Sequence, residues 1–162
     1  MTQACGLRLL MAAFALSTST IAASAGPFPE ASSFDASADA GAQLDAALAK
    51  AAGSGKKVLL IMGANWCHDS RALAGWLETP RLKQLLSDKY ETVFVDVGAP
   101  YAGQGRNLEL AKRFGLELKG TPNVLILSPA GDLLNRKTAT RWRNASSRSE
   151  AEIYDELAKA AG

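Results

Sequence analysis

Cys67 is the residue of this chain best suited to covalent chemistry. It lies in Trp66-Cys67-His68-Asp69-Ser70, directly after the apolar run Val58–Met62. A cysteine at the start of a helix faces unpaired N–H groups and the positive end of the helix dipole, and both favour the thiolate. Ser70 follows three residues later, so its hydroxyl can share the face of Cys67 and donate a hydrogen bond to the sulfur. This spacing predicts a nucleophilic thiol, with Cys67 and Ser70 as the candidate catalytic residues.

The thiol of Cys67 has no second cysteine near it in the sequence. The other cysteine of the chain, Cys5, precedes the first apolar run. Ser70 carries no sulfur, so a mixed disulfide between Cys67 and a substrate must be resolved by the substrate's second thiol or by an external thiol. We therefore expect protein thiols or disulfides as substrates, with a small-molecule thiol as a further candidate partner, and no cofactor. The alternative is that Cys67 is an inert, buried residue.

The first 25 residues are typical of a signal peptide. Arg8 supplies a positive charge, Leu9–Leu16 form a short apolar core, and Ala23-Ser24-Ala25 provides the small residues that precede a cleavage site. The apolar core is too short to cross a bilayer, which takes about 20 residues in a helix. We expect cleavage after Ala25 and a periplasmic or secreted protein without a membrane partner. An uncleaved amphipathic anchor is the alternative.

Composition and charge narrow the class of protein. The chain has 162 residues, of which 48% are hydrophobic and 21% are charged, as in ordinary globular proteins. Lys and Arg number 18 against 16 Asp and Glu, a balance that argues against nucleic acid as a partner. Residues 26–38, rich in Pro, Ser and Ala, are predicted to be a flexible lead-in, and 39–162 a single domain. We expect a monomer or a weak dimer.

Hydrophobic periodicity predicts helices that alternate with strands. The predicted helices span 39–52, about 67–77, 81–89, 107–114 and 149–160, and the predicted strands span 58–62, 92–97 and 124–127, with a return strand from Leu133. This order predicts a parallel pair with a right-handed crossover, followed by an antiparallel hairpin. Both parallel strands end at one edge of the sheet, where ligands tend to bind. That edge would carry the segments 63–70 and 98–106 and the start of the strand after Pro122.

Several short motifs, taken in order, resemble the thioredoxin superfamily. They are Val58–Ser70, Val93–Asp96, Arg113-Phe114-Gly115, Gly120-Thr121-Pro122 and Pro129–Asp132. The resemblance covers about 44–160 and is nearest to exported bacterial thioredoxin-like proteins with a Cys-x-x-Ser site. It implies a thioredoxin-like α/β fold, with a central mixed sheet flanked by helices.

The same resemblance implies roles for individual residues. Cys67 takes the position of the attacking cysteine, Ser70 that of the resolving cysteine, and Pro122 that of a cis-proline facing the thiol. The substrate would meet Trp66, His68, Thr121 and Pro122, and the backbone at Thr121 would pair with an extended substrate strand.

The chain departs from the family pattern at two further positions. The acid that the family buries six positions before the first cysteine is Ile61 here. Because that acid helps to deprotonate the resolving thiol, its absence agrees with Ser70. The family's helix-kinking proline is replaced by Gly75, which still permits a bend.

Three functions fit these residues. The first is an exported thiol–disulfide oxidoreductase or isomerase that acts through one cysteine by a mixed disulfide. The second is a redox-silent thioredoxin-fold module that binds peptides or acts as a chaperone. The third is metal handling by Cys67, His68 and Asp69. We expect no metal site, because adjacent helix residues do not face one another.

Basic residues gather near the C-terminus around one aromatic residue. They are Arg136, Lys137, Arg141, Arg143 and Arg148, with Trp142 among them. A solvated surface is one interpretation, and a face for an acidic client is the other.

Overall fold

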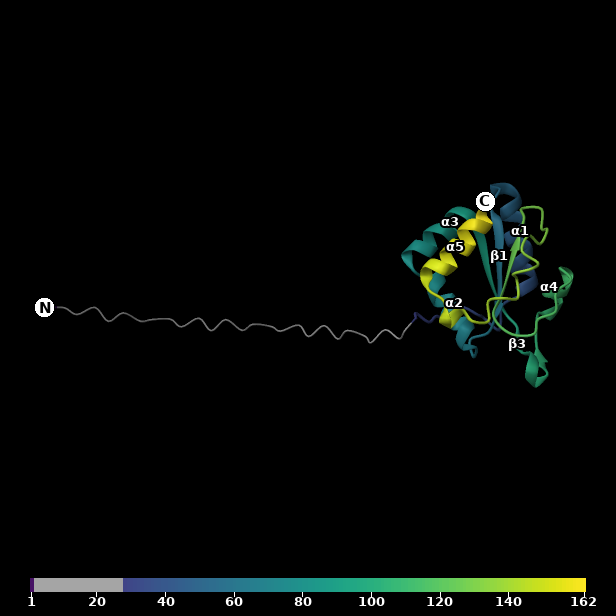
Figure 1. Ribbon diagram of the computed structural model, residues 1–162, viewed down its shortest axis with the longest axis horizontal. Coiled ribbons are helices and arrows are strands. Elements are labelled where there is room, and N and C mark those ends of the chain that lie inside the picture. The colour runs from purple at the N-terminus through teal and green to yellow at the C-terminus, as the bar shows by residue number, and fades with distance from the viewer. Residues whose placement is uncertain (2–27) are drawn as a thin grey trace.

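The structure is a computed structural model, and it describes Met1 and residues 28–162. The predicted signal peptide and its cleavage site lie outside the described residues, apart from Met1. The domain is built on a three-stranded sheet in the order β2-β1-β5, with helices around it (Figure 1). Strand β1 (Lys57–Gly63) pairs in parallel with β2 (Tyr90–Asp96) and antiparallel with β5 (Asn123–Leu127). The predicted α/β class, with a mixed sheet flanked by helices, is confirmed.

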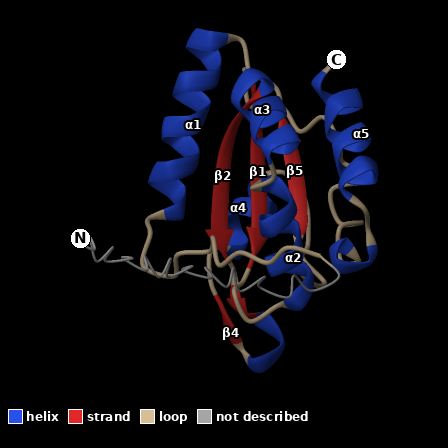
Figure 2. Cartoon of the chain, turned by 90° about the vertical axis from the view of Figure 1, so that its left-hand side faces the viewer, coloured by secondary structure: helices blue, strands red, loops and turns tan. Residues whose placement is uncertain are grey.

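Strand β1 is buried on both faces, as its uninterrupted apolar run predicts. Leu59 and Ile61 point into a core shared with α2 (His68–Leu77), α3 (Pro80–Lys89) and α5 (Glu150–Ala161). Leu60 and its neighbours on the other face pack against α1 (Ala40–Ser54) and α4 (Leu108–Arg113). Figure 2 shows the three strands side by side between α1 and α5. The alternation of side chains along one strand thus supplies both cores.

Local signals fix the ends of two helices. Asp39 caps α1, where its Oδ1 accepts a hydrogen bond from the Ala42 N–H at 2.9 Å. Ser149 and Glu152 form the predicted capping box of α5, each side chain bonding the other's backbone N–H. No helix within residues 28–162 combines the length and the apolar character needed to cross a bilayer.

The hairpin predicted after β5 is reduced to a single bridge between Leu127 and Leu133. A side chain replaces the return strand further along the edge. The amide of Asn135 accepts from the Ile126 N–H and donates to the Val124 carbonyl, both at 2.8 Å. The amide offers the same donor and acceptor as a backbone unit. Together with the Leu134 N–H, which donates to the Ile126 carbonyl, and the Ala139 carbonyl, which accepts from the Val124 N–H, it satisfies the outer edge of β5 without a regular second strand.

The predicted flexible lead-in over 26–38 is wrong for its described part, 28–38, which packs against the domain. Phe34 is buried in the α2-side core, and its backbone exchanges two hydrogen bonds with the Asn65 side chain, at 3.1 and 2.8 Å. Gly75 allows this approach, because a Cβ there would meet the backbone of Pro29. Burial of one aromatic side chain offsets the ordering of a segment whose composition resembles a linker.

Candidate functional site

Cys67 lies at the C-terminal edge of the sheet, between β1 and α2. It is the N-cap residue of α2, with extended backbone angles, and its side chain is partly exposed. The Sγ lies 3.4 Å from the carbonyl oxygen of Thr121, to which the thiol donates a hydrogen bond. The Thr121–Pro122 peptide bond is cis. The structure thus brings together two segments that are more than 50 residues apart, Cys67 and Thr121-Pro122.

Ser70 lies beneath this site and faces inward. Its side chain is fully buried, and its Oγ has no hydrogen-bond partner within the described residues. The hydrogen bond predicted from Ser70 to the Cys67 sulfur is therefore absent. The cause is packing against β1, since a Cβ added to Gly63 would lie 2.7 Å from the Ser70 Oγ.

Trp66 and His68 flank the cysteine and contact different segments. Trp66 has 53% of its surface exposed, and its Nε1 donates to the Gly98 carbonyl at 2.8 Å. The exposed His68 has its Nδ1 3.5 Å from Glu30 Oε1. Its ring meets that of Phe28 edge to face, with centroids 4.8 Å apart. Trp66 is thus held toward the 98–106 segment, and His68 toward the N-terminal segment.

Asp69 has a structural contact that the sequence did not reveal. Its Oδ1 accepts hydrogen bonds from the backbone N–H and the hydroxyl of Ser146, at 2.9 and 2.7 Å. These bonds join the first turn of α2 to the 3₁₀ helix η2 (Ala145–Ser147). Cys67, His68 and Asp69 therefore have separate partners. No three His, Cys, Asp or Glu side chains in the part of the chain that the structure describes gather closely enough to hold a metal ion.

The 98–106 segment forms a short hairpin beside the thiol rather than an open loop. It consists of β3 (Gly98–Ala99), the 3₁₀ helix η1 (Pro100–Ala102) and β4 (Gln104–Gly105). Arg106 returns to the end of β2, where its Nε lies 3.4 Å from Asp96 Oδ1. The Trp66 indole holds the start of this hairpin.

Tyr101 and Arg143 complete the surroundings of the site, and sequence reasoning did not select either as a site residue. The Tyr101 hydroxyl donates to the Lys119 carbonyl at 2.8 Å, and the Arg143 guanidinium reaches the same oxygen at 3.4 Å. Gly120 leaves room for both, because a Cβ there would meet Arg143 Cδ and lie 3.0 Å from the Tyr101 hydroxyl. The cluster of basic residues in 136–148 could have indicated Arg143. Nothing in the sequence indicates Tyr101 except its position in the 98–106 segment.

The arrangement suits attack on an extended partner. Cys67 is partly exposed, and its sulfur lies next to the backbone of Thr121. Thr121 is buried, and within the described residues its N–H makes no hydrogen bond, which leaves an unpaired donor beside the sulfur. An extended ligand that pairs with this backbone would supply the missing acceptor. Exposed Trp66 and Tyr101 stand on the neighbouring segments.

Comparisons with known proteins agree with this geometry. Residues 39–129 match the family model described as thioredoxin-like. A solved structure of a disulphide isomerase from Xylella fastidiosa Temecula1 is 35% identical, with a TM-score of 0.73, covering 80% of this chain and 96% of that one. A thioredoxin from Thermus thermophilus is 25% identical, with a TM-score of 0.51, covering 72% and 82%. No curated protein sequence matches the chain.

These likenesses extend over both halves of the site, since the matched residues include Cys67 and Thr121-Pro122. They support thiol–disulfide exchange as the general class of chemistry. The chain belongs to the thioredoxin-like family.

Proposed function

We propose that this protein is an exported thiol–disulfide oxidoreductase or isomerase that acts through Cys67 alone. The observation that carries the proposal is the partly exposed Cys67, whose sulfur lies 3.4 Å from the Thr121 carbonyl at the cis Thr121–Pro122 bond. Its likeness to a disulphide isomerase over most of both chains supports the same reaction class. The predicted signal peptide supports export to a compartment in which disulfides persist.

The reaction begins with attack of the Cys67 thiolate on one sulfur of a substrate disulfide. The substrate S–S bond breaks, a mixed disulfide forms, and the other substrate sulfur leaves as a thiolate. Ser70 has no sulfur with which to displace the substrate. The mixed disulfide is resolved when a substrate thiolate attacks it, which regenerates Cys67 and leaves the substrate rearranged. This cycle is an isomerisation and consumes no reductant. Net reduction would take two molecules of an external thiol: the first attacks the Cys67 sulfur and releases the reduced substrate, and the second regenerates Cys67 and leaves as the external disulfide.

Recovery of activity by a scrambled, disulfide-bonded ribonuclease tests the proposal. The chain carrying Cys5→Ser, which leaves Cys67 as its sole thiol, should speed recovery in proportion to its concentration. The further change Cys67→Ser should remove this acceleration while keeping the fold, because the two side chains are similar in size. Equal recovery with and without the Cys67 thiol would refute a cysteine-dependent isomerase.

A redox-silent peptide-binding module is the second candidate, and one observation favours it. The Cys67 thiol donates to a carbonyl oxygen, a contact that only the protonated sulfur makes. In that case Cys67→Ser would suppress aggregation of an unfolded client as well as the native chain does. Reaction with iodoacetamide at pH 7 separates the two, since a working nucleophile should react faster than free glutathione.

A further inference from the structure

We propose that a cationic surface beside the thiol selects acidic segments of the client. This surface consists of Lys119, Arg136, Lys137, Arg141 and Arg143, and the inference rests on the proposed thiol–disulfide exchange. The partner that reaches Cys67 is then an extended protein segment with carboxylate side chains near its disulfide.

The surface begins at the site itself. Arg143 packs against Gly120: a Cβ built on this glycine would lie 3.2 Å from Arg143 Nη1. Gly120 directly precedes Thr121, whose carbonyl receives the Cys67 thiol. A guanidinium is therefore held one residue from the backbone that the thiol touches. A segment bound at the sulfur can therefore meet this charge with one of its neighbouring side chains.

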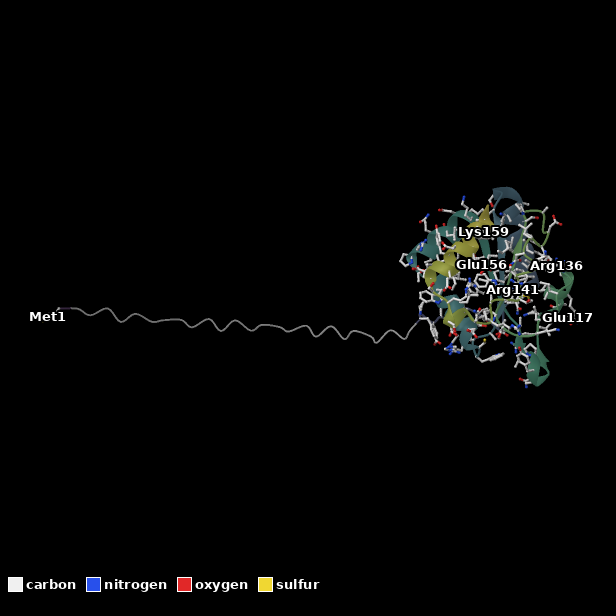
Figure 3. The ribbon with its side chains drawn as sticks, in the orientation of Figure 1. Met1, Glu117, Arg136, Arg141, Glu156 and Lys159 are labelled. Carbon is white, nitrogen blue, oxygen red and sulfur yellow. The ribbon has the colours of Figure 1, made fainter. Side chains whose placement is uncertain are left out.

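The positive charges line three surface hollows that share residues with one another. Lys119 and Arg143 line one hollow, Arg143 and Arg141 a second, and Arg141 shares a third with Arg136 and Lys137. Figure 3 shows the labelled Arg136 and Arg141 on one face of the domain. The positive charges therefore extend from Lys119 and Arg143, beside the site, to Arg136 and Arg141 on that face.

The five cations lack carboxylate partners within the described residues. No Asp or Glu oxygen lies within 4 Å of their charged nitrogens; Arg136 and Arg143 donate only to the carbonyls of Gly115 and Lys119. Arg148, by contrast, is paired with Glu156 at 2.6 Å. Side chains of all five residues are exposed. An anionic ligand can bind them without displacing an internal ion pair.

The charge is concentrated in one stretch of sequence. Residues 117–148 contain six Lys or Arg against two Asp or Glu, although the whole chain is nearly balanced at 18 against 16. Two acidic side chains also line the hollows: Glu117 beside Lys119 and Arg143, and Glu156, which is paired with Arg148, beside Arg141. A protein segment fits this surface better than a nucleic acid, because the adjoining thiol needs sulfur in its partner.

Three short peptides of equal length test the proposal. Each contains one cysteine activated as a 2-thiopyridyl disulfide, flanked by Glu, Gln or Lys. The Cys67 thiolate attacks the peptide sulfur, the S–S bond breaks, and the pyridinethiolate leaves and takes up a proton as 2-thiopyridone, which is read by absorbance. The full chain carries Cys5→Ser, so Cys67 is the only thiol. The result compared is the ratio of the rate for the Glu peptide to that for the Lys peptide.

Opposite charges about 4 Å apart in water change a rate about fivefold, so two such contacts should give a ratio above about ten at low salt. The ratio should shrink at about 1 M salt, because the Debye length is then only about 3 Å and the charges interact weakly beyond it. Arg143→Glu and Lys119→Glu should each lower the ratio at least about threefold. The matched control is Lys89→Glu, which makes the same charge change at an exposed residue. Lys89 ends α3 and directly precedes β2, so it lies at the end of the sheet opposite to Cys67. This change should leave the ratio unchanged.

Equal rates for all three peptides would overturn the acidic-client inference and leave the thiol chemistry standing. The acidic-client inference is also overturned if Lys89→Glu lowers the ratio as much as Lys119→Glu, because net charge alone would then explain the preference. If no peptide releases 2-thiopyridone, both the proposed function and this inference fail.

Discussion

Replacing Ser70 with alanine tests whether this residue serves the thiol or the packing beneath it. The Ser70 hydroxyl is fully buried and has no hydrogen-bond partner within the described residues. An unpaired buried hydroxyl costs about 1–3 kcal/mol. Removing its oxygen leaves a small space. Deleting a whole buried methylene group costs on the order of 1 kcal/mol, and the oxygen leaves a smaller space than that. The balance predicts that Ser70→Ala raises the free energy of unfolding by about 1 kcal/mol.

Urea unfolding followed by tryptophan fluorescence measures this change. The two proteins can be compared if the m value, the slope of the unfolding free energy against urea concentration, is the same for both. Exposed Ser87 on α3 provides the matched control, and Ser87→Ala should shift stability by less than about 0.5 kcal/mol. The Cys67 sulfur bonds Thr121 instead of Ser70. Alkylation of Cys67 at pH 7 should therefore stay within about twofold of the native rate. A loss of stability, or a tenfold slower alkylation, would refute this reasoning and restore Ser70 as a hydrogen-bond donor to the sulfur.

Three further predictions concern other parts of the molecule. Ser70→Cys places a second sulfur three residues after Cys67, so mass spectrometry of the oxidised variant should find an internal disulfide; free thiols at both positions would contradict this. Phe34→Ala removes a core aromatic that is 2% exposed, and urea titration should show a loss of about 3–5 kcal/mol. A loss under about 1 kcal/mol would mean that residues 28–38 contribute little to the packing of the domain, as expected of a linker. Burial raises the pKa of Tyr90 to about 12, above the value near 10 in an unfolded chain. Stability present below about pH 10 should therefore be lost toward pH 12, by at most about 2 to 3 kcal/mol; an equal loss in Tyr90→Phe would contradict the assignment.

Much of the fold could be predicted because its signals are local. The apolar run Val58–Met62 shows a strand buried on both faces, and the Ser149–Glu152 box marks the start of α5 at the right residue. The alternation of strands and helices then brings Cys67 and Pro122 to one edge of the sheet. These features depend on near neighbours in the sequence or on general rules of connection.

The parts that could not be predicted depend on single contacts between distant residues. The Asn135 side-chain amide bonds the edge of β5 where a regular strand was expected, and Phe34 is the buried residue of a segment whose composition resembles a linker. Asp69 joins Ser146 across 77 residues. Spacing correctly puts Ser70 one helical turn from Cys67, but packing under Gly63 turns its hydroxyl inward. Hydrophobic periodicity does not predict the rotamer that a buried side chain such as that of Ser70 adopts.

Mass spectrometry of an acid-quenched mixture with a disulfide-bonded client tests the central claim most directly. The Cys5→Ser chain should yield one covalent adduct, with the client joined at Cys67. The adduct should disappear with dithiothreitol and be absent after Cys67→Ser. A chain that forms no adduct while the client's disulfides rearrange, or one that forms the same adduct without the Cys67 thiol, would contradict catalysis through this sulfur.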